Sequence, residues 1–273
     1  MTRPGLRRGT SEIVVFGRHP VEAALASSNV EVAGVDILRT RPPAERDGLR
    51  RRCEKRGVPF REISRSAMDA LTGAPRHDQG VAASVRLLRV MELESLIAET
   101  KGRGARRPLR VLALDGVTNS QNVGMVVRSV VAAGFDGLLW PMSGQPWVNG
   151  LVVRAAAGAI FECPIVVCDR LETGLGLLSG AGFESIGLDA AAGESLFEAE
   201  PPHRAVYVLG SESQGLSAGV AEQLDRRLAI PMHGAVESLN VAVAAGLVCY
   251  RACGALASAR APTTASRPDR ESV

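Results

Sequence analysis

The sequence predicts an α/β protein whose larger part is built on a mostly parallel sheet. Short apolar runs alternate with helix-like segments from residue 12 to residue 256 of the 273-residue chain. The runs at 109–114 and 206–209 are nearly continuous in apolar residues, as in parallel strands that are covered on both faces. The runs at 206–209 and 228–230 each end in a glycine-bearing loop, and such loops bind ligands in open α/β sheets.

Residues 12–88 are predicted to form a small α/β unit, preceded by a loose basic arm at 1–11. Pro20 stands at the start of its first helix, and Ser64 or Ser66 can cap its last one. The expected elements are strands at 13–16, 30–38, 58–63 and 81–85, alternating with helices at 21–26, 46–56 and a third that ends at Leu71.

A basic linker at 89–108, with a helix at 91–100, is expected to lead into the larger unit at 109–256. Residues 257–273 are polar and proline-bearing, so a disordered tail is expected there. The expected elements of the larger unit are strands at 109–114, 137–140, 164–167, 183–188, 206–209 and 228–230, and helices at 124–133, 149–160, 171–179, 218–224 and from 239 onward.

The amino-acid composition indicates which class of protein this is and which partners it can bind. Hydrophobic content of 46% with 22% charged residues is typical of a soluble protein with a full core. The net charge is only +3, but arginines cluster at 7–8, 50–52 and 103–110, which suits either a phosphate backbone or a solvated face. Aromatic content of 4% argues against base stacking as the main mode of binding.

Five cysteines form no CxxC pair and no zinc spacing, so reduced thiols, a cytoplasmic location and no metal site are expected. No segment is long and apolar enough to span a bilayer, and no signal-peptide core is present at the amino end.

Polar side chains stand among residues that are otherwise typical of a core. Glu212 follows the run at 206–209, while Ser238 and Asn240 bracket the start of the last helix, which Ser238 is expected to cap. Asn122 can cap a helix that begins at Gly124. Arg128 is a single charged residue on that mostly apolar helix, and burying it without a partner would be unfavourable. Capping or a surface salt bridge explains Asn122, Glu212 and Ser238 at least as readily as catalysis does. For Arg128 the alternative is the exposed rim of the helix, and a functional role is favoured.

Three ordered segments, NSQNVGMVVRS, LGSESQGL and IPMHGAVESLNVAVAAG, resemble the motifs of the SpoU (TrmH-type) branch of the SPOUT RNA methyltransferases. FGRHPVEAAL and RHDQGVAASV resemble the RNA-binding domain that precedes many of these catalytic domains. The resemblance implies methyl transfer from S-adenosylmethionine to a ribose 2′-hydroxyl. It also implies a SPOUT-type sheet with a deep carboxyl-terminal trefoil knot, which periodicity alone would never suggest. No GxGxxG motif follows the first strand, in agreement with a non-Rossmann cofactor site.

The resemblance also implies roles for individual residues. The first-motif arginine, Arg128 here, is the family's proposed activator of the 2′-hydroxyl, and it would face the cofactor methyl group across the pocket. Asn122 would orient that arginine or the ribose, and Glu212, Ser238 and Asn240 would line the active site. The positions implied to hold the cofactor, largely through backbone groups, are Leu209, Gly210, Ile230, Met232, Leu239 and Asn240.

Two positions depart from the family pattern. Asn119 stands where aspartate is frequent, and Ala242 stands where serine is frequent, so a secondary hydrogen bond is expected to be missing. Arg154 matches a recurring family arginine for which contact with substrate is the weaker expectation. His233 is a weak candidate for a base, and His77 is more typical of a turn or a core.

The sequence therefore predicts a homodimeric RNA 2′-O-methyltransferase that has the last helix at its interface and takes part of its active site from the partner chain. Large-subunit ribosomal RNA is favoured over transfer RNA, because this type of amino-terminal domain occurs in ribosomal RNA enzymes. The alternatives are a tRNA methyltransferase, a non-catalytic RNA-binding or ribosome-assembly protein, which the Ala242 departure favours, and a related enzyme that methylates bases.

Overall fold

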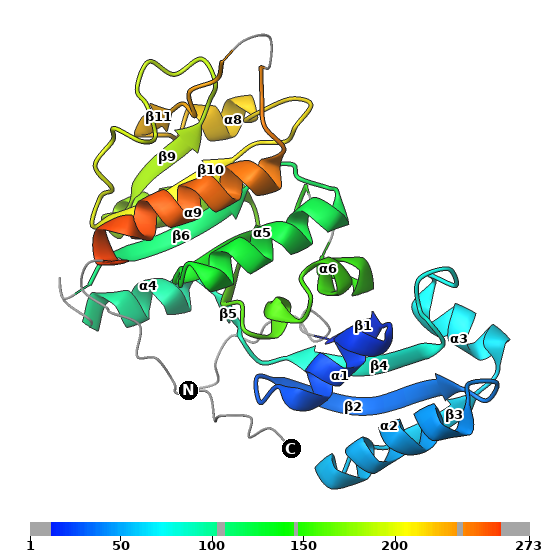
Figure 1. The fold of residues 1–273 in the computed structure, drawn as a ribbon. Coiled ribbons are helices and arrows are strands. Elements are labelled where there is room, and N and C mark those ends of the chain that lie inside the picture. The colour runs from blue at the N-terminus through cyan, green and yellow to red at the C-terminus, as the bar shows by residue number, and fades with distance from the viewer. Residues whose placement is uncertain (1–11, 103–106, 145–146, 234–236, 258–273) are drawn as a thin grey trace, which may run out of the picture.

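Two β-sheets organise the chain in the computed structural model (Figure 1). The structure describes residues 12–102, 107–144, 147–233 and 237–257. The expected basic arm, the arginine-rich stretch at 103–106 and the expected tail from residue 258 onward lie outside the described residues.

The smaller sheet has four strands in the order β1-β4-β2-β3. Strand β4 is antiparallel to β1 and β2, whereas β2 and β3 are parallel. Ser64 caps the third helix, because its hydroxyl accepts a hydrogen bond from the Ala67 amide. The elements are β1 Glu12–Phe16, α1 Arg18–Ala26, β2 Val30–Leu38, α2 Pro43–Arg56, β3 Phe60–Ile63, α3 Arg65–Thr72 and β4 Val81–Leu87.

The larger sheet has seven strands in the order β11-β9-β10-β6-β7-β8-β5, and every neighbouring pair is parallel. Its edge strand β5 was expected to be linker and helix, but it pairs with β8 instead. The strands are β5 Val90–Glu92, β6 Leu109–Leu114, β7 Gly137–Pro141, β8 Ile165–Cys168, β9 Glu184–Leu188, β10 Arg204–Leu209 and β11 Arg226–Leu228. The helices are α4 Leu93–Gly102, α5 Ser120–Ala132, α6 Gly150–Ala155, α7 Leu171–Gly180, α8 Ala218–Ala221 and α9 Val241–Ala257.

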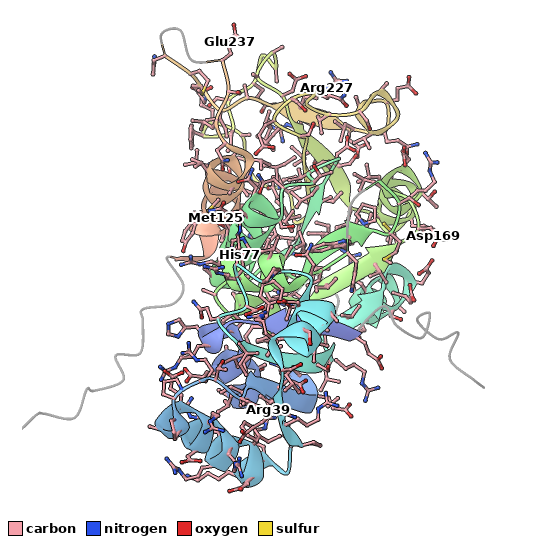
Figure 2. All side chains as sticks on the ribbon, turned by 90° about the vertical axis from the view of Figure 1, so that its right-hand side faces the viewer. Arg39, His77, Met125, Asp169, Arg227 and Glu237 are labelled. Carbon is pink, nitrogen blue, oxygen red and sulfur yellow. The ribbon has the colours of Figure 1, made fainter. Side chains whose placement is uncertain are left out.

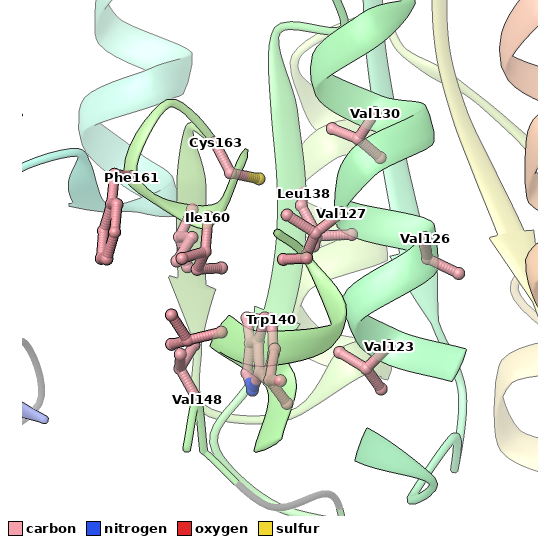
Figure 3. Packing of buried hydrophobic residues seen from close by; sticks show 14 of the residues in the cluster. Val123, Val126, Val127, Val130, Leu138, Trp140, Val148, Ile160, Phe161 and Cys163 are labelled. Atoms are coloured by element: carbon pink, nitrogen blue, oxygen red, sulfur yellow. The ribbon is translucent and has the colours of Figure 1, made fainter. Parts of the chain in front are cut away.

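Helices cover both faces of the larger sheet. Alternate residues of β6 point to opposite sides, so that Val111 packs in a cluster with residues of α4 and α7, whereas Leu112 packs in a cluster with residues of α5 and α9. Figure 1 shows α5 and α9 crossing one face of the sheet, and Figure 3 shows valines of α5 near Leu138 and Trp140 of β7. Burial on both faces explains why these strands are apolar at almost every position.

The helix expected over 149–160 is interrupted. Helix α6 ends at Ala155, and the chain then turns through Ala157 (φ 50°) and Gly158 (φ 86°) before a short 3₁₀ helix, Ala159–Phe161. A Cβ atom on Gly158 would lie 2.8 Å from the Cβ atom of Ala23 in α1. The turn therefore allows this segment to contact the amino-terminal part of the protein.

Within the described ranges, no helix is long and apolar enough to cross a membrane. The same residues contain no group of three or more histidine, cysteine, aspartate or glutamate side chains that could hold a metal ion.

Candidate active site

A cavity of about 550 Å³ lies at the carboxyl ends of β9, β10 and β11, which is a size suited to a small organic ligand. It is lined by five of the six positions predicted to hold the cofactor, Leu209, Gly210, Ile230, Met232 and Leu239. The sixth, Asn240, is not in the described lining. Other residues of its wall include Leu188, Asp189, Ser211, Glu212, Gln214, Gly215, Arg227, Glu237, Ser238, Val241 and Ala244.

Gly210 is required by the chain itself. A Cβ atom there would lie 2.1 Å from the carbonyl carbon of Gly215. Ser211 and Gly215 exchange backbone hydrogen bonds of 3.0 and 2.9 Å, so the loop after β10 closes directly over Gly210. This contact within the chain requires a glycine at position 210 whether or not a ligand is bound.

A chain of side-chain hydrogen bonds joins the three motif segments. The side-chain Nδ2 of Asn122 donates to the Glu212 carboxylate, and the side-chain Nδ2 of Asn240 donates to Asn122 Oδ1 at 3.1 Å. Asn122 is 90 residues from Glu212 and 118 residues from Asn240 along the chain. The side chain of Asn122, which is buried, therefore connects the loop of Glu212, which lines the cavity, with Asn240, whose neighbours Leu239 and Val241 line it.

Asn122 does not cap its helix, contrary to one sequence-based expectation. Helix α5 begins at Ser120, and its cap is Asn119, whose Oδ1 accepts from the amides of Gln121 (2.9 Å) and Asn122 (3.3 Å). An aspartate in place of Asn119 would accept the same bonds, which explains why this departure from the family pattern is structurally mild.

Asn240 has two structural roles at the start of α9. Its Oδ1 accepts a hydrogen bond of 2.9 Å from the Ala242 amide, while its Nδ2 donates to Asn122. The helix begins at Val241, so the prediction that Ser238 caps it is wrong. Ser238 is exposed and lines the cavity.

Arg128 does not line the cavity. It lies on α5, its side chain is exposed, and it forms no ion pair or hydrogen bond with any described residue. The expected arrangement, with this guanidinium across the pocket from the cofactor, is therefore not formed by the described part of a single chain. His233 is also exposed and outside the cavity lining, while Arg154 and His77 contact each other elsewhere.

Three carboxylates and one guanidinium line the cavity among the residues described. Asp189 and Arg227 form an ion pair of 3.3 Å, and Glu212 and Glu237 add two further negative charges. This balance favours a ligand with a positively charged centre. Asp189 was missed by the sequence analysis, although it directly follows β9 at the same sheet edge as the predicted residues.

Asp115 is a second residue that the sequence analysis missed. It follows β6, and its Oδ2 accepts a hydrogen bond of 2.6 Å from the Ser217 amide. This contact ties the loop after β10 to the end of the neighbouring strand. The loop that carries Glu212 is thus anchored from two sides, by Asp115 and by Asn122.

Comparison with known proteins adds independent findings. Residues 109–250 match the SpoU rRNA methylase family, and residues 14–91 match the RNA 2′-O ribose methyltransferase substrate-binding family. The chain is 35% identical over 207 residues to a 23S rRNA (guanosine-2′-O-)-methyltransferase from Xanthomonas campestris, an alignment that covers 75% of this chain and 81% of the relative. It is 32% identical over 235 residues to an uncharacterized tRNA/rRNA methyltransferase from Mycolicibacterium gilvum, with coverage of 86% and 74%.

The fold is also similar to that of solved proteins. The SpoU methyltransferase AviRb from Streptomyces viridochromogenes, solved in complex with AdoMet, superposes with a TM-score of 0.70 at 22% identity. That alignment covers 94% of this chain and 95% of the solved one. At this level of identity the similarity concerns the fold.

Proposed function

This chain belongs to the SpoU rRNA methylase family and is an RNA methyltransferase that uses S-adenosylmethionine; from this premise we propose that it methylates a ribose 2′-hydroxyl of large-subunit ribosomal RNA. The observation that carries the proposal is the hydrogen-bonded junction of Asn122, Glu212 and Asn240, of which Glu212 lines the cavity. The name of the Xanthomonas relative supports the ribosomal substrate, and the proposed site of action is the cytoplasm.

The residues of the cavity fit the cofactor. S-adenosylmethionine supplies a methyl group on a good leaving group, with a positive charge at the sulfonium. Glu212, Asp189 and Glu237 provide negative charge around the cavity, and Ile230 and Leu239 provide apolar wall for an adenosine. The backbone at Leu209 and Gly210 offers the polar groups that would orient the base.

The main task of the protein in this reaction is alignment, because an in-line displacement depends on the placement of the nucleophile. Asn122 fixes Asn240 and Glu212 relative to each other, and Ser238 lies exposed beside them. We propose that Ser238 and Asn240 position the ribose. Arg128 is proposed to hold the RNA phosphate and the 2′-hydroxyl and to favour loss of the hydroxyl proton.

The active form is proposed to be a homodimer in which Arg128 completes the site. An apolar groove on the outer face of α9 is lined by Phe197, Val243, Gly246, Leu247, Tyr250 and Arg251. Phe197, Val243 and Tyr250 are 48%, 52% and 63% exposed, which is unusual for large apolar side chains of a monomer. Helix α5, which carries Arg128, packs against α9, so an interface built on α9 would lie near that arginine.

The proposal includes the division of the chain into an RNA-binding unit at 12–88 and a catalytic unit at 109–256, which the two family matches support. It also includes the trefoil knot formed by the chain from Val206 onward, for which the similarity of fold is the support.

The test is incubation with methyl-labelled S-adenosylmethionine and separate pools of ribosomal and transfer RNA, followed by mapping of the labelled nucleotide. Label on a ribose of large-subunit RNA is expected. The Arg128→Ala variant should lose turnover and still bind the cofactor. Label confined to transfer RNA, a methylated base, or no label with RNA binding retained would each overturn the proposal, the last in favour of a non-catalytic RNA-binding protein.

A further inference from the structure

A second cavity, of about 560 Å³, lies where the two parts of the chain meet. We call it the interdomain cleft; it is lined by His77, Asn119, Ser120, Gln121, Leu151, Arg154 and Ala155. His77 comes from the loop before β4, whereas the other residues belong to the start of α5 and to α6. Among the residues that the structure describes, the cleft has no acidic residue in its lining and shares no lining residue with the active-site cavity.

The arginine and the histidine of the cleft contact each other. Arg154 Nη1 lies 3.0 Å from His77 Nδ1. A guanidinium can only donate, so Nδ1 must accept and the proton of the neutral ring is on Nε2. Arg154 has no carboxylate partner among the described residues. The remaining Arg154 N–H groups and His77 Nε2–H are thus donors without an anion.

The loop that carries His77 is held rigidly. The buried Asp78 accepts hydrogen bonds from Gly80 N (2.7 Å) and from the Arg65 guanidinium. Gln79 adopts φ 52°, an unfavourable conformation for a residue with a side chain, and its Oε1 accepts from the Arg18 amide at 3.0 Å. Backbone strain of this kind persists where the surrounding structure imposes it, often at functional sites.

The opposite wall is fixed by close packing between the two parts. A Cβ atom on Gly150, the first residue of α6, would lie 2.1 Å from the Phe16 ring, and Gly158 approaches Ala23 as described above. Helix α6 is thereby pressed onto β1 and α1, and Arg154 faces His77 across the junction. Figure 2 shows His77 at this junction, between Arg39 in the amino-terminal part and Arg227 at the far end of the protein.

We infer that the interdomain cleft binds a backbone phosphate of the RNA, with Arg154 and His77 as its donors; this inference rests on the proposed function. A guanidinium beside an imidazole, in a cleft whose described lining contains no carboxylate, matches a phosphodiester oxygen pair. Gln121 lines the cleft and the next residue, Asn122, joins the active-site network, so one turn of α5 borders both sites. A strand held in the cleft would continue toward the reacting ribose.

The test measures binding of a fluorescein-labelled single-stranded RNA oligonucleotide by anisotropy over a range of KCl concentrations, because phosphate contacts do not depend on sequence. The Arg154→Ala variant should bind roughly tenfold more weakly. The slope of log affinity against log salt should fall in magnitude by about 0.7, the value for one lost contact to a single strand. Arg154→Lys should keep the slope, because it keeps the charge, and lose part of the affinity.

The matched control is Arg170→Ala, which removes an exposed arginine paired with Glu172 at the start of α7, and neither affinity nor slope should change. His77→Ala should weaken binding without a change in slope. Unchanged affinity for S-adenosylmethionine would confirm that the variants are folded.

An Arg154→Ala variant whose RNA affinity and salt slope equal those of the wild type would overturn the inference. If the Arg154–His77 pair is purely structural, Arg154→Ala will lower the melting temperature and leave the salt slope unchanged. That result would also overturn the inference. The proposed function is judged separately, by methyl transfer with the wild-type protein, so failure of one does not imply failure of the other.

Discussion

Asn122 links three segments of the chain that are far apart in sequence. Its side-chain nitrogen donates a hydrogen bond to Glu212, and its side-chain oxygen accepts one from Asn240. Neither a hydrophobic residue nor a carboxylate at this position could form both bonds. The motifs predicted that these residues share a site. That Asn122 occupies the centre of the network was not predictable, because it depends on α5 beginning at Ser120.

Asn122→Ala is expected to destabilise the protein by about 1–3 kcal/mol, because it removes both hydrogen bonds of a buried side chain, and to reduce methyl transfer. Urea unfolding and turnover measure the two effects. Asn119→Asp is the matched control for stability, since it preserves the cap of the same helix turn and should leave the free energy of unfolding unchanged. Wild-type stability in Asn122→Ala would show that the network contributes nothing to the fold.

The buried thiol of Cys163 gives a prediction about pH. Burial raises the pKa of Cys163 to about 12, against about 8.5 in an unfolded chain. Between these values the folded state keeps a proton that the unfolded state has lost, so the free energy of unfolding falls as pH rises. From pH ~8 to pH ~10 this one thiol should lower the free energy of unfolding by about 2 kcal/mol.

Urea unfolding of the wild type and of Cys163→Ala at the two pH values measures this contribution as the difference between their pH dependences. The variant should be less stable at pH ~8 because of the missing sulfur, and this difference should shrink by about 2 kcal/mol at pH ~10. Equal pH dependences in the two proteins would mean that the folded thiol ionises normally.

Helices α5 and α6 cross so closely that only glycine fits at one position. A Cβ atom on Gly124 would lie 2.4 Å from the Ala155 Cβ atom and 2.7 Å from the Val152 carbonyl oxygen. Gly124→Ala should therefore cost about 1–3 kcal/mol through overpacking. Gly48 in α2 has no atom within 4 Å of such a Cβ, and Gly48→Ala should instead stabilise by about 0.5–1 kcal/mol. Thermal unfolding of both variants should show shifts of opposite sign.

Strand positions were largely predictable, because strands buried on both faces are apolar at almost every residue. The break after α6 was not. Its local sequence, RAAAGA, is rich in good helix formers, but docking of Gly158 against Ala23 requires a turn there. The start of α5 was placed at Gly124, four residues late, because Asn119 was not recognised as its cap.

At the scale of the whole molecule, the sequence predicted a parallel sheet but not its strand order. Strand β10 lies between β9 and β6, although its residues are 95 positions along the chain from their partners in β6, and no local pattern encodes that pairing. The edge strand β5 contains only three residues, which is too short to give a recognisable pattern. The prediction for Arg128 also differs from the structure, because this residue does not line the cavity in the described part of one chain.

If the groove on α9 is the dimer interface, a charge placed in its centre should separate the protomers. Tyr250→Glu would bury a carboxylate among Phe197, Val243 and Leu247, and dimer affinity should fall by roughly 100-fold or more. Sedimentation velocity measures the association state, and methyl transfer should fall with it, because the partner is proposed to complete the site. Leu88→Glu, at a residue 51% exposed in the amino-terminal part, should leave the association state unchanged. A Tyr250→Glu protein that remains dimeric would exclude this face as the interface, and a fully active monomer would show that one chain contains the entire active site.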